Sequence, residues 1–152
     1  LALRSQECAQ RRQFVGARTF EGLTGALAIT RSTQVDPDGS VPHIRATKDA
    51  DCLVVAPATA GLIARLAAGA CGDAVCLAAV ASSCRRVLCP AMNDAMWLDP
   101  VVQENAAALR ARGMRVLGPV TGHLAEGYDA IGRMVEPDAI TTEIENMLAV
   151  RP

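Results

Sequence analysis

The sequence predicts an α/β domain in which helices flank a parallel β-sheet. Short apolar runs, such as residues 52–56 and 87–89, alternate with longer segments whose apolar residues recur at helical spacing. Half of the residues are hydrophobic but only 3% are aromatic, so Ala, Val, Leu and Ile must build the core. Such a core suits helices that pack closely on a parallel sheet.

Bulk properties restrict the domain organisation and the partners. A length of 152 residues is typical of one domain, so we expect residues 1–152 to form a single unit. The formal net charge of −1 gives no strong field for nucleic acid or an acidic membrane, and no apolar run is long enough to span a bilayer. The six cysteines form no CxxC pair, which disfavours a zinc site and suits the reducing cytoplasm.

The first third of the chain carries weak signals. Residues 1–13 have no clear pattern, whereas residues 14–27 predict a short helix around 19–23 that ends at Gly25. The next predicted elements are a short strand at 26–30, a loop at 34–42 with turn residues at 36–40, and a short helix at 43–50.

The middle of the chain predicts a strand at 52–56 that Pro57 ends and a helix that Thr59 caps. That helix carries apolar residues at helical spacing, and a second helical segment follows Gly72 and Asp73 at residues 74–81. The apolar residues at this spacing are Leu62, Ile63, Leu66 and Ala70.

After the strand at 87–89, Asp99 and Pro100 give a strong helix start, with the helix at 101–112 and a stop at Gly113. A strand at 114–117, a loop or hairpin at 121–132 and a last helix that opens at 136–138 complete the prediction. The last helix has one apolar face, formed by Ile140, Ile144 and Leu148.

Two junctions share one design, in which a strand is followed by Pro, Ala, a polar residue and a helix. The polar residues are Thr59 and Asn93. Open α/β sheets bind ligands at the carboxyl ends of their strands, so the two junctions suggest two lips of one crevice. Thr59 and Asn93 are also favoured helix caps, and Met92, Met96 and Trp97 have the spacing of core residues. His43 is either a proton-transfer group or an ordinary loop histidine.

Several segments together resemble the flavin-dependent cysteine decarboxylases, and most closely the phosphopantothenoylcysteine (PPC) decarboxylases of coenzyme A biosynthesis. They are His43-Ile44, Ala50-Asp51, VVAPATA from Val54, PAMNDAMW from Pro90 and LAEGYDAIGRMVEP from Leu124. The resemblance implies a flavodoxin-like (Rossmann-like) fold with three layers and an FMN cofactor. It also implies a cytoplasmic homotrimer or dodecamer with sites between subunits.

The resemblance also implies residue roles. His43 matches the family's essential histidine, and Asn93 matches the residue that binds the substrate carboxylate. Met96 and Leu124 are expected at the substrate, Leu124 in a flap that closes over it. Glu126, in the same flap, stands where many PPC decarboxylases carry a Cys. The expected FMN contacts are Thr59, Ala60, Gly61, Leu62 and Ala91, with Gly61 in a position where Asn is common.

The implied reaction is redox-assisted. FMN oxidises the cysteinyl side chain to a thioaldehyde, which acts as the electron sink for loss of carbon dioxide. Reduced FMN then returns the electrons and gives the aminothiol. Asn93 would orient the carboxylate without the charge of an Arg, and His43 would transfer a proton near the thiol.

Three alternatives stay open. Oxidative decarboxylation of a peptide's C-terminal cysteine would end at the enethiol, and the missing flap Cys favours it. The resemblance implies that the family's first strand and phosphate loop are missing from residues 1–13, which favours a non-catalytic flavin-binding or regulatory subunit. Flavin prenyltransferases share the implied fold, but the PAMN block fits decarboxylation better.

Overall fold

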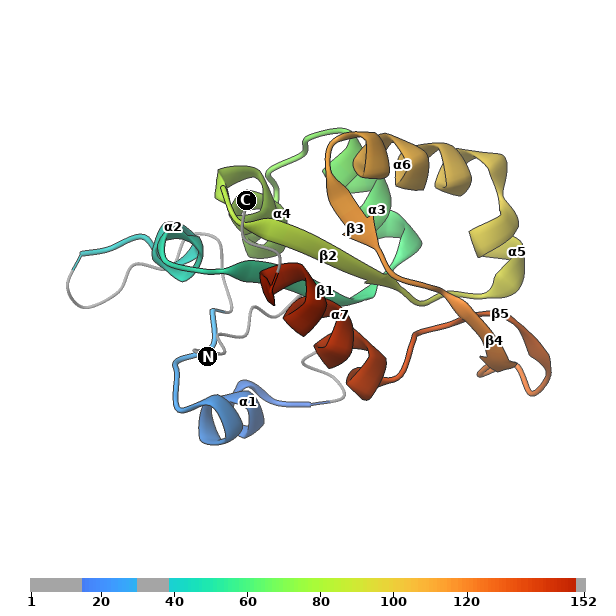
Figure 1. The fold of residues 1–152 in the computed structure, drawn as a ribbon, viewed down its shortest axis with the longest axis horizontal. Coiled ribbons are helices and arrows are strands. Elements are labelled where there is room, and N and C mark those ends of the chain that lie inside the picture. Colours follow the sequence, from blue (N-terminus) through green and yellow to red (C-terminus); the bar gives the residue numbers. More distant parts are fainter. Residues whose placement is uncertain (1–14, 30–38, 150–152) are drawn as a thin grey trace. The chain divides into compact units, whose positions relative to one another are not determined.

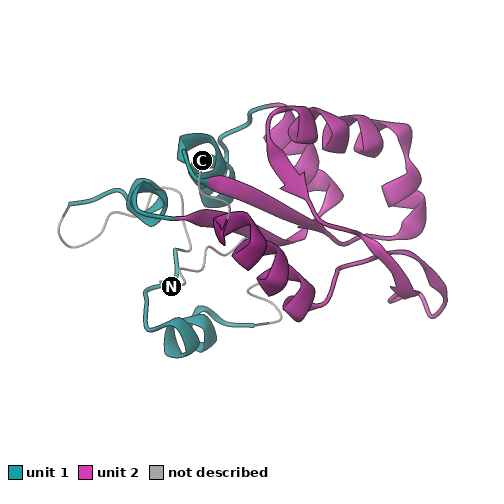
Figure 2. Cartoon of the chain, viewed as in Figure 1, with its two compact units in different colours: residues 1–50, 69–84 teal, residues 51–68, 85–152 magenta. Residues whose placement is uncertain are grey.

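The computed structural model describes residues 15–29 and 39–149 (Figure 1). They belong to two compact units, one drawn from Leu1–Ala50 and Gly69–Cys84 and the other from Asp51–Ala68 and Arg85–Pro152 (Figure 2). The single domain expected from the chain length stays a prediction. Within the described residues, no helix is both long and apolar enough to cross a membrane.

The first unit contains the helices α1 (Ala17–Thr24), α2 (Pro42–Lys48) and α4 (Ala74–Ala81). Gly25 ends α1 in the left-handed conformation, with φ +66°, as its position in the sequence predicts. Asp73 caps α4 by accepting a hydrogen bond from the Cys76 N–H at 2.8 Å. Helices α2 and α4 pack against each other. All three helices lie where the sequence predicts them.

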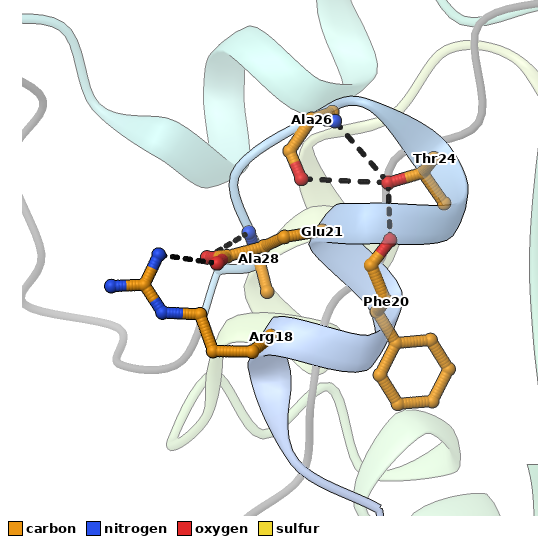
Figure 3. Close-up of polar contacts among 6 residues, drawn as sticks. All are labelled: Arg18, Phe20, Glu21, Thr24, Ala26 and Ala28. Atoms are coloured by element: carbon orange, nitrogen blue, oxygen red, sulfur yellow. Dashed lines mark hydrogen bonds and ion pairs between the residues drawn. The ribbon is translucent and has the colours of Figure 1, made fainter.

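The end of α1 is held by side chains that bond to the backbone (Figure 3). The Thr24 hydroxyl donates to the Phe20 carbonyl at 2.8 Å, which satisfies one carbonyl of the last turn. Glu21 accepts from the Ala28 N–H at 3.3 Å and from Arg18 at 3.2 Å. These contacts tie the segment after Gly25 back onto the helix.

That tied segment is not the predicted strand. Ala28 and Ile29 are buried, but only Ile29 makes an isolated bridge, and no strand runs through the described part of 26–30. A short apolar run has the same appearance in a strand and in a buried loop. The loop and turn predicted at 34–42 lie mostly outside the described residues.

The second unit contains a parallel sheet of β1 (Cys52–Ala58), β2 (Arg85–Pro90) and β3 (Met114–Val116) in the order β1-β2-β3. Its helices are α3 (Ala60–Ala67), α5 (Asp94–Leu98), α6 (Pro100–Ala111) and α7 (Pro137–Ala149). The predicted hairpin is present as β4 (Val120–His123) and β5 (Asp129–Arg133), which pair antiparallel.

Three layers build this unit. Val87 and Cys89 of β2 pack with Ile140 of α7 and with Val135, which precedes that helix. Leu88 alternates with them and is also fully buried, so both faces of the strand are covered. Helices α3 and α6 pack against each other over the opposite face (Figure 1). The predicted α/β fold with a parallel sheet between helices is therefore confirmed.

Two boundary predictions around β1 are wrong. The strand does not end at Pro57 but continues to Ala58, with a shift in register between Val55 and Ala58. A proline, which has no N–H to give to the ladder, is tolerated at such an irregularity. Helix α3 ends at Ala67, so Ala70 lies beyond it, whereas Leu62, Ile63 and Leu66 are buried as predicted.

Cys89 and Cys71 provide a contrast in thiol reactivity. Cys89 is fully buried, and burial, with a smaller contribution from Cys52, raises the pKa of its thiol to about 11. Cys71 is exposed. We expect iodoacetamide at pH 8 to alkylate Cys71 in the folded chain, whereas Cys89 reacts only in denaturant, because the thiolate is the nucleophile. Peptide mass mapping checks this, and rapid alkylation of native Cys89 would contradict the buried position of β2.

Candidate functional site

The two strand–Pro–Ala junctions lie side by side in the second unit. Ala58 and Pro90 are register partners at the ends of β1 and β2, and the Ala91 N–H donates to the Ala58 carbonyl at 3.2 Å. The next residues on either side are Thr59 and Met92, which lead into α3 and α5. The backbone pairing therefore places both junctions at one edge of the sheet, whereas the crevice between them stays a prediction.

The first junction starts α3. The Thr59 side chain accepts from the Leu62 N–H at 3.3 Å, which confirms its predicted capping role. The N–H groups of Ala60 and Gly61 precede the first complete turn and have no acceptor inside the helix. Gly61 is exposed, and a side chain built there would meet only Arg65 Nη1, at 3.6 Å. Two backbone donors without an acceptor inside the helix therefore stand at the end of β1.

The second junction is organised by Asn93. Its Oδ1 accepts from the Ala95 N–H at 2.9 Å, so the side chain does cap α5. Its Nδ2 donates to the Glu126 Oε1 at 3.1 Å and to the Tyr128 hydroxyl oxygen at 3.0 Å. Interpreting Asn93 as a plain cap is therefore correct but incomplete, because the amide hydrogens are directed at the β4–β5 hairpin.

The hairpin tip is an ordered turn. The Leu124 N–H donates to the Tyr128 carbonyl at 2.9 Å, and the Gly127 N–H donates to the Leu124 carbonyl at 3.0 Å. Leu124 is buried, whereas Glu126 and Tyr128 are exposed. The segment that the resemblance makes a flap is thus part of a hairpin that presents Glu126 and Tyr128 to the start of α5, and its closure over a substrate stays a prediction.

A second bond joins the same two segments. The Tyr128 hydroxyl donates to the Asp94 carboxylate at 2.6 Å, a charge-assisted hydrogen bond. This bond lowers the pKa of Asp94 and raises the pKa of Tyr128. Because the folded-state pKa of Asp94 lies below its unfolded value, the stabilisation is present above the unfolded value and is lost as the pH falls through the folded one.

Gly132 lets the base of the hairpin approach the second junction. The Met92 N–H donates to the Gly132 carbonyl at 3.0 Å. A Cβ on Gly132 would come within 2.2 Å of the Met92 carbonyl oxygen, and the φ of Gly132 is +149°. The absence of a side chain is therefore what permits this contact.

Gly132→Ala is expected to lower the free energy of unfolding by about 2 kcal/mol or more, because backbone atoms must move apart. Urea denaturation followed by circular dichroism measures the effect. Gly61→Ala is the matched control, since its new Cβ meets nothing closer than 3.6 Å. Equal stability of the two variants would refute the tight contact at Met92.

The other predicted site residues differ in burial and in the unit to which they belong. Trp97 is buried, as the core interpretation requires, but Met96 is 50% exposed and is not a core residue. His43 is the second residue of α2 in the first unit, where its carbonyl accepts from the Thr47 hydroxyl at 3.0 Å. The structure thus groups Thr59, Asn93 and Glu126 within one unit and places His43 in the other.

Two residues of the site were not predicted from the sequence, Asp94 and Tyr128. Tyr128 is the only tyrosine of the chain and lies two residues after Glu126, and Asp94 is adjacent to Asn93. A lone aromatic residue with a polar end in a glycine-containing turn was the available signal. Its partner could not be read from the sequence, because 34 residues separate Tyr128 from Asp94.

Comparison with known proteins gives one consistent result. The profile of the Flavoprotein family matches residues 4–149. The coenzyme A biosynthesis bifunctional protein CoaBC of Mycobacterium bovis is 42% identical over 136 residues, which are 90% of this chain and 32% of that protein. The chain therefore spans about a third of the length of this curated relative.

Solved structures agree with this result. The FMN-dependent cysteine decarboxylase SpaF superposes with a TM-score of 0.79 at 32% identity, over 97% of this chain and 79% of its own. A PPC decarboxylase mutant complexed with pantothenoylaminoethenethiol gives a TM-score of 0.74 at 25% identity, over 81% of this chain and 71% of its own. The chain belongs to the Flavoprotein family of FMN-dependent cysteine decarboxylases and is homologous to CoaBC.

Proposed function

We propose that this chain catalyses the FMN-dependent decarboxylation of PPC to phosphopantetheine, a step of coenzyme A biosynthesis. The observation that carries the proposal is the Asn93 amide, whose Nδ2 holds a carboxylate oxygen, Glu126 Oε1, at 3.1 Å. The identity of 42% with CoaBC supports PPC as the substrate.

The first junction fits the family's cofactor. FMN carries several hydrogen-bond acceptors, and the N–H groups of Ala60 and Gly61 are donors with no acceptor inside the helix. Thr59 and Leu62 fix the start of the helix through their own bond, and Ala91 lies beside the end of β1. When bound, FMN would supply the two-electron oxidation of the substrate's cysteinyl side chain. The Asn that is common at position 61 in the family would also find room there.

Asn93 would bind the substrate carboxylate through an amide N–H. Because its Oδ1 is already held by the Ala95 N–H, only the Nδ2 side can face the ligand. A neutral donor orients the carboxylate but stabilises its charge less than an Arg would. That balance suits decarboxylation, in which the negative charge must leave the carboxylate in the transition state.

The remaining candidates are assigned by chemistry and position. His43 would transfer a proton at the substrate sulfur, since an imidazole changes its charge near neutral pH. Leu124, buried at the hairpin tip, and the half-exposed Met96 would give the apolar surroundings of the substrate and exclude water. Glu126 would have to leave the Asn93 amide when the substrate carboxylate binds.

The FMN-loaded chain should be incubated separately with PPC and with a peptide that ends in cysteine. The proposal predicts that PPC loses carbon dioxide alone, which mass spectrometry detects. Loss of carbon dioxide together with two hydrogens would show that the reaction stops at the enethiol. If the peptide reacts and PPC does not, the proposal is wrong and the chain modifies peptides.

Peptidyl-cysteine oxidation is the second candidate, and Glu126 is the observation that favours it. The hairpin tip presents the Glu126 carboxylate where many PPC decarboxylases carry a Cys that assists reduced FMN in reducing the enethiol. A carboxylate cannot supply that thiol, so without its assistance the two electrons would stay on reduced FMN and the product would leave as the enethiol. The identity of 32% with the cysteine decarboxylase SpaF is compatible with this candidate.

For the assembly, we propose a cytoplasmic homotrimer or a dodecamer built from trimers, as the resemblance implies. Light scattering of the FMN-loaded chain would give the mass. A chain that binds FMN but turns over only when mixed with an active relative would instead support a regulatory subunit. Normal turnover by the homo-oligomer would exclude that alternative.

A further inference from the structure

Both polar atoms of the Asn93 side-chain amide have hydrogen-bond partners, and this fixes the orientation of the amide. Oδ1 accepts from the Ala95 N–H, a group that can only donate, so the amide cannot be flipped. The two hydrogens of Nδ2 then face two acceptors, the Tyr128 hydroxyl oxygen at 3.0 Å and Glu126 Oε1 at 3.1 Å. The amide oxygen thus has one partner and the amide nitrogen has two.

Tyr128 is itself oriented. A phenol has a single O–H hydrogen, and that hydrogen is donated to the Asp94 carboxylate in a hydrogen bond of 2.6 Å. The lone pairs of the Tyr128 oxygen are therefore left to accept from Asn93 Nδ2. The relay from Asp94 through Tyr128 to Asn93 has only one consistent direction, with every donor facing an acceptor.

Backbone hydrogen bonds hold the hairpin that carries this chain of side-chain hydrogen bonds. The Met92 N–H binds the Gly132 carbonyl at the base of β5, and the Leu124 N–H binds the Tyr128 carbonyl at the tip. Tyr128 thus immediately precedes β5, and Gly132 near the far end of that strand is bonded to the residue before Asn93. A side chain mounted in this way can position its neighbour, because little of its own freedom remains to be lost.

We propose that Tyr128 is a positioning residue, which occupies one N–H of Asn93 so that the other N–H points to a carboxylate position that Glu126 Oε1 fills in the free chain. The inference rests on the proposed function for the identity of the incoming carboxylate. The ligand class is an α-carboxylate next to a cysteine side chain. Glu126 is then an internal competitor for that ligand.

The first test is Tyr128→Phe, which removes one oxygen and keeps the ring. We expect the side-chain amide resonances of Asn93 to move and the pKa of Asp94, followed by NMR titration, to rise. In assays with PPC, KM should rise about tenfold while kcat stays within about twofold, because the lost contact acts on carboxylate binding. Unmoved amide resonances or an unchanged KM would overturn the proposal.

Asp94 supplies a conservative pair of variants. Asp94→Asn still offers an oxygen to the Tyr128 hydroxyl and should keep KM within about twofold, whereas Asp94→Ala should raise KM like Tyr128→Phe. Asp129→Asn is the control for general damage to the hairpin, since Asp129 pairs with His123 and does not touch Asn93. An equal rise in KM for Asp129→Asn would overturn the proposal, because the effect would then belong to the hairpin as a whole.

A binding experiment separates this inference from the proposed reaction. N-Acetyl-S-methylcysteine has the carboxylate but no free thiol to oxidise, and its titration can be followed on the Asn93 amide resonances. Glu126→Gln should tighten binding about threefold or more, and Tyr128→Phe should weaken it about tenfold. If these affinity changes are seen but PPC is not turned over, the proposed function is wrong and the positioning role of Tyr128 stands. Identical affinities in all three proteins would sink the positioning role even if PPC is decarboxylated.

Discussion

Replacing His43 by asparagine is expected to lower decarboxylation of PPC by about 100-fold or more, because a proton-transfer group contributes on this order. Asparagine is similar in size and forms hydrogen bonds, but it cannot take up a proton near neutral pH. His43 is the second residue of α2, and the side-chain hydrogen bond recorded at it among the described residues goes to its backbone carbonyl, from the Thr47 hydroxyl. The substitution should therefore leave the helix and FMN binding intact.

The measurement is kcat/KM for PPC, with bound FMN determined by absorbance. His123→Asn is the matched control, since His123 is the other histidine of the chain and is exposed, paired with Asp129 on the hairpin. It should retain the activity of the unmodified chain. Full activity of His43→Asn would mean that His43 is an ordinary surface histidine.

Asn93→Asp is the second substitution with a large expected effect. Aspartate is as good a helix cap as asparagine, so the bond to the Ala95 N–H and the start of α5 persist. The new carboxylate would face Glu126 and the substrate carboxylate, and it would have no N–H to donate. Two like charges about 4 Å apart repel by about 4 kcal/mol at an effective dielectric constant of about 20, and solvent at this half-exposed position reduces that value.

We expect Asn93→Asp to lower kcat/KM for PPC by about 100-fold or more, mainly through KM. Asn93→Ala separates the two roles of the residue, because it loses the cap and the donor but adds no charge. It should unfold at a lower urea concentration than Asn93→Asp yet bind PPC better. A wild-type KM in Asn93→Asp would reduce Asn93 to a helix cap.

Local signals explain why much of the fold could be predicted. Asp99 and Pro100 mark the start of α6, and Thr59 caps α3, because capping depends on residues within one turn. The parallel sheet follows from alternation of apolar strands with helices. Each of these inferences uses chemistry that neighbouring residues complete among themselves.

Non-local contacts explain where the sequence misled. The run at 26–30 has the composition of a strand, but a strand also needs a partner, and only an isolated bridge forms at Ile29. In β1, pairing with β2 carries the strand past Pro57 to Ala58, which no local rule gives. The extent of a strand is decided by its neighbour.

The candidate site was found only in part for the same reason. Asn93 was singled out because it follows a buried strand, a position the sequence reveals. Tyr128 was missed because its contact with Asn93 joins residues 35 apart, through a hairpin whose register the sequence left open. The pairing of β4 with β5 is what brings Glu126 and Tyr128 to the same amide.

The most direct test of the central claim is carbon dioxide release from PPC labelled at its carboxyl carbon. The chain, loaded with stoichiometric FMN, would be mixed with this substrate without oxygen. The account predicts labelled carbon dioxide in proportion to the PPC consumed, with phosphopantetheine as the product. If FMN is bound but no labelled carbon dioxide is released and PPC stays intact, the account is contradicted.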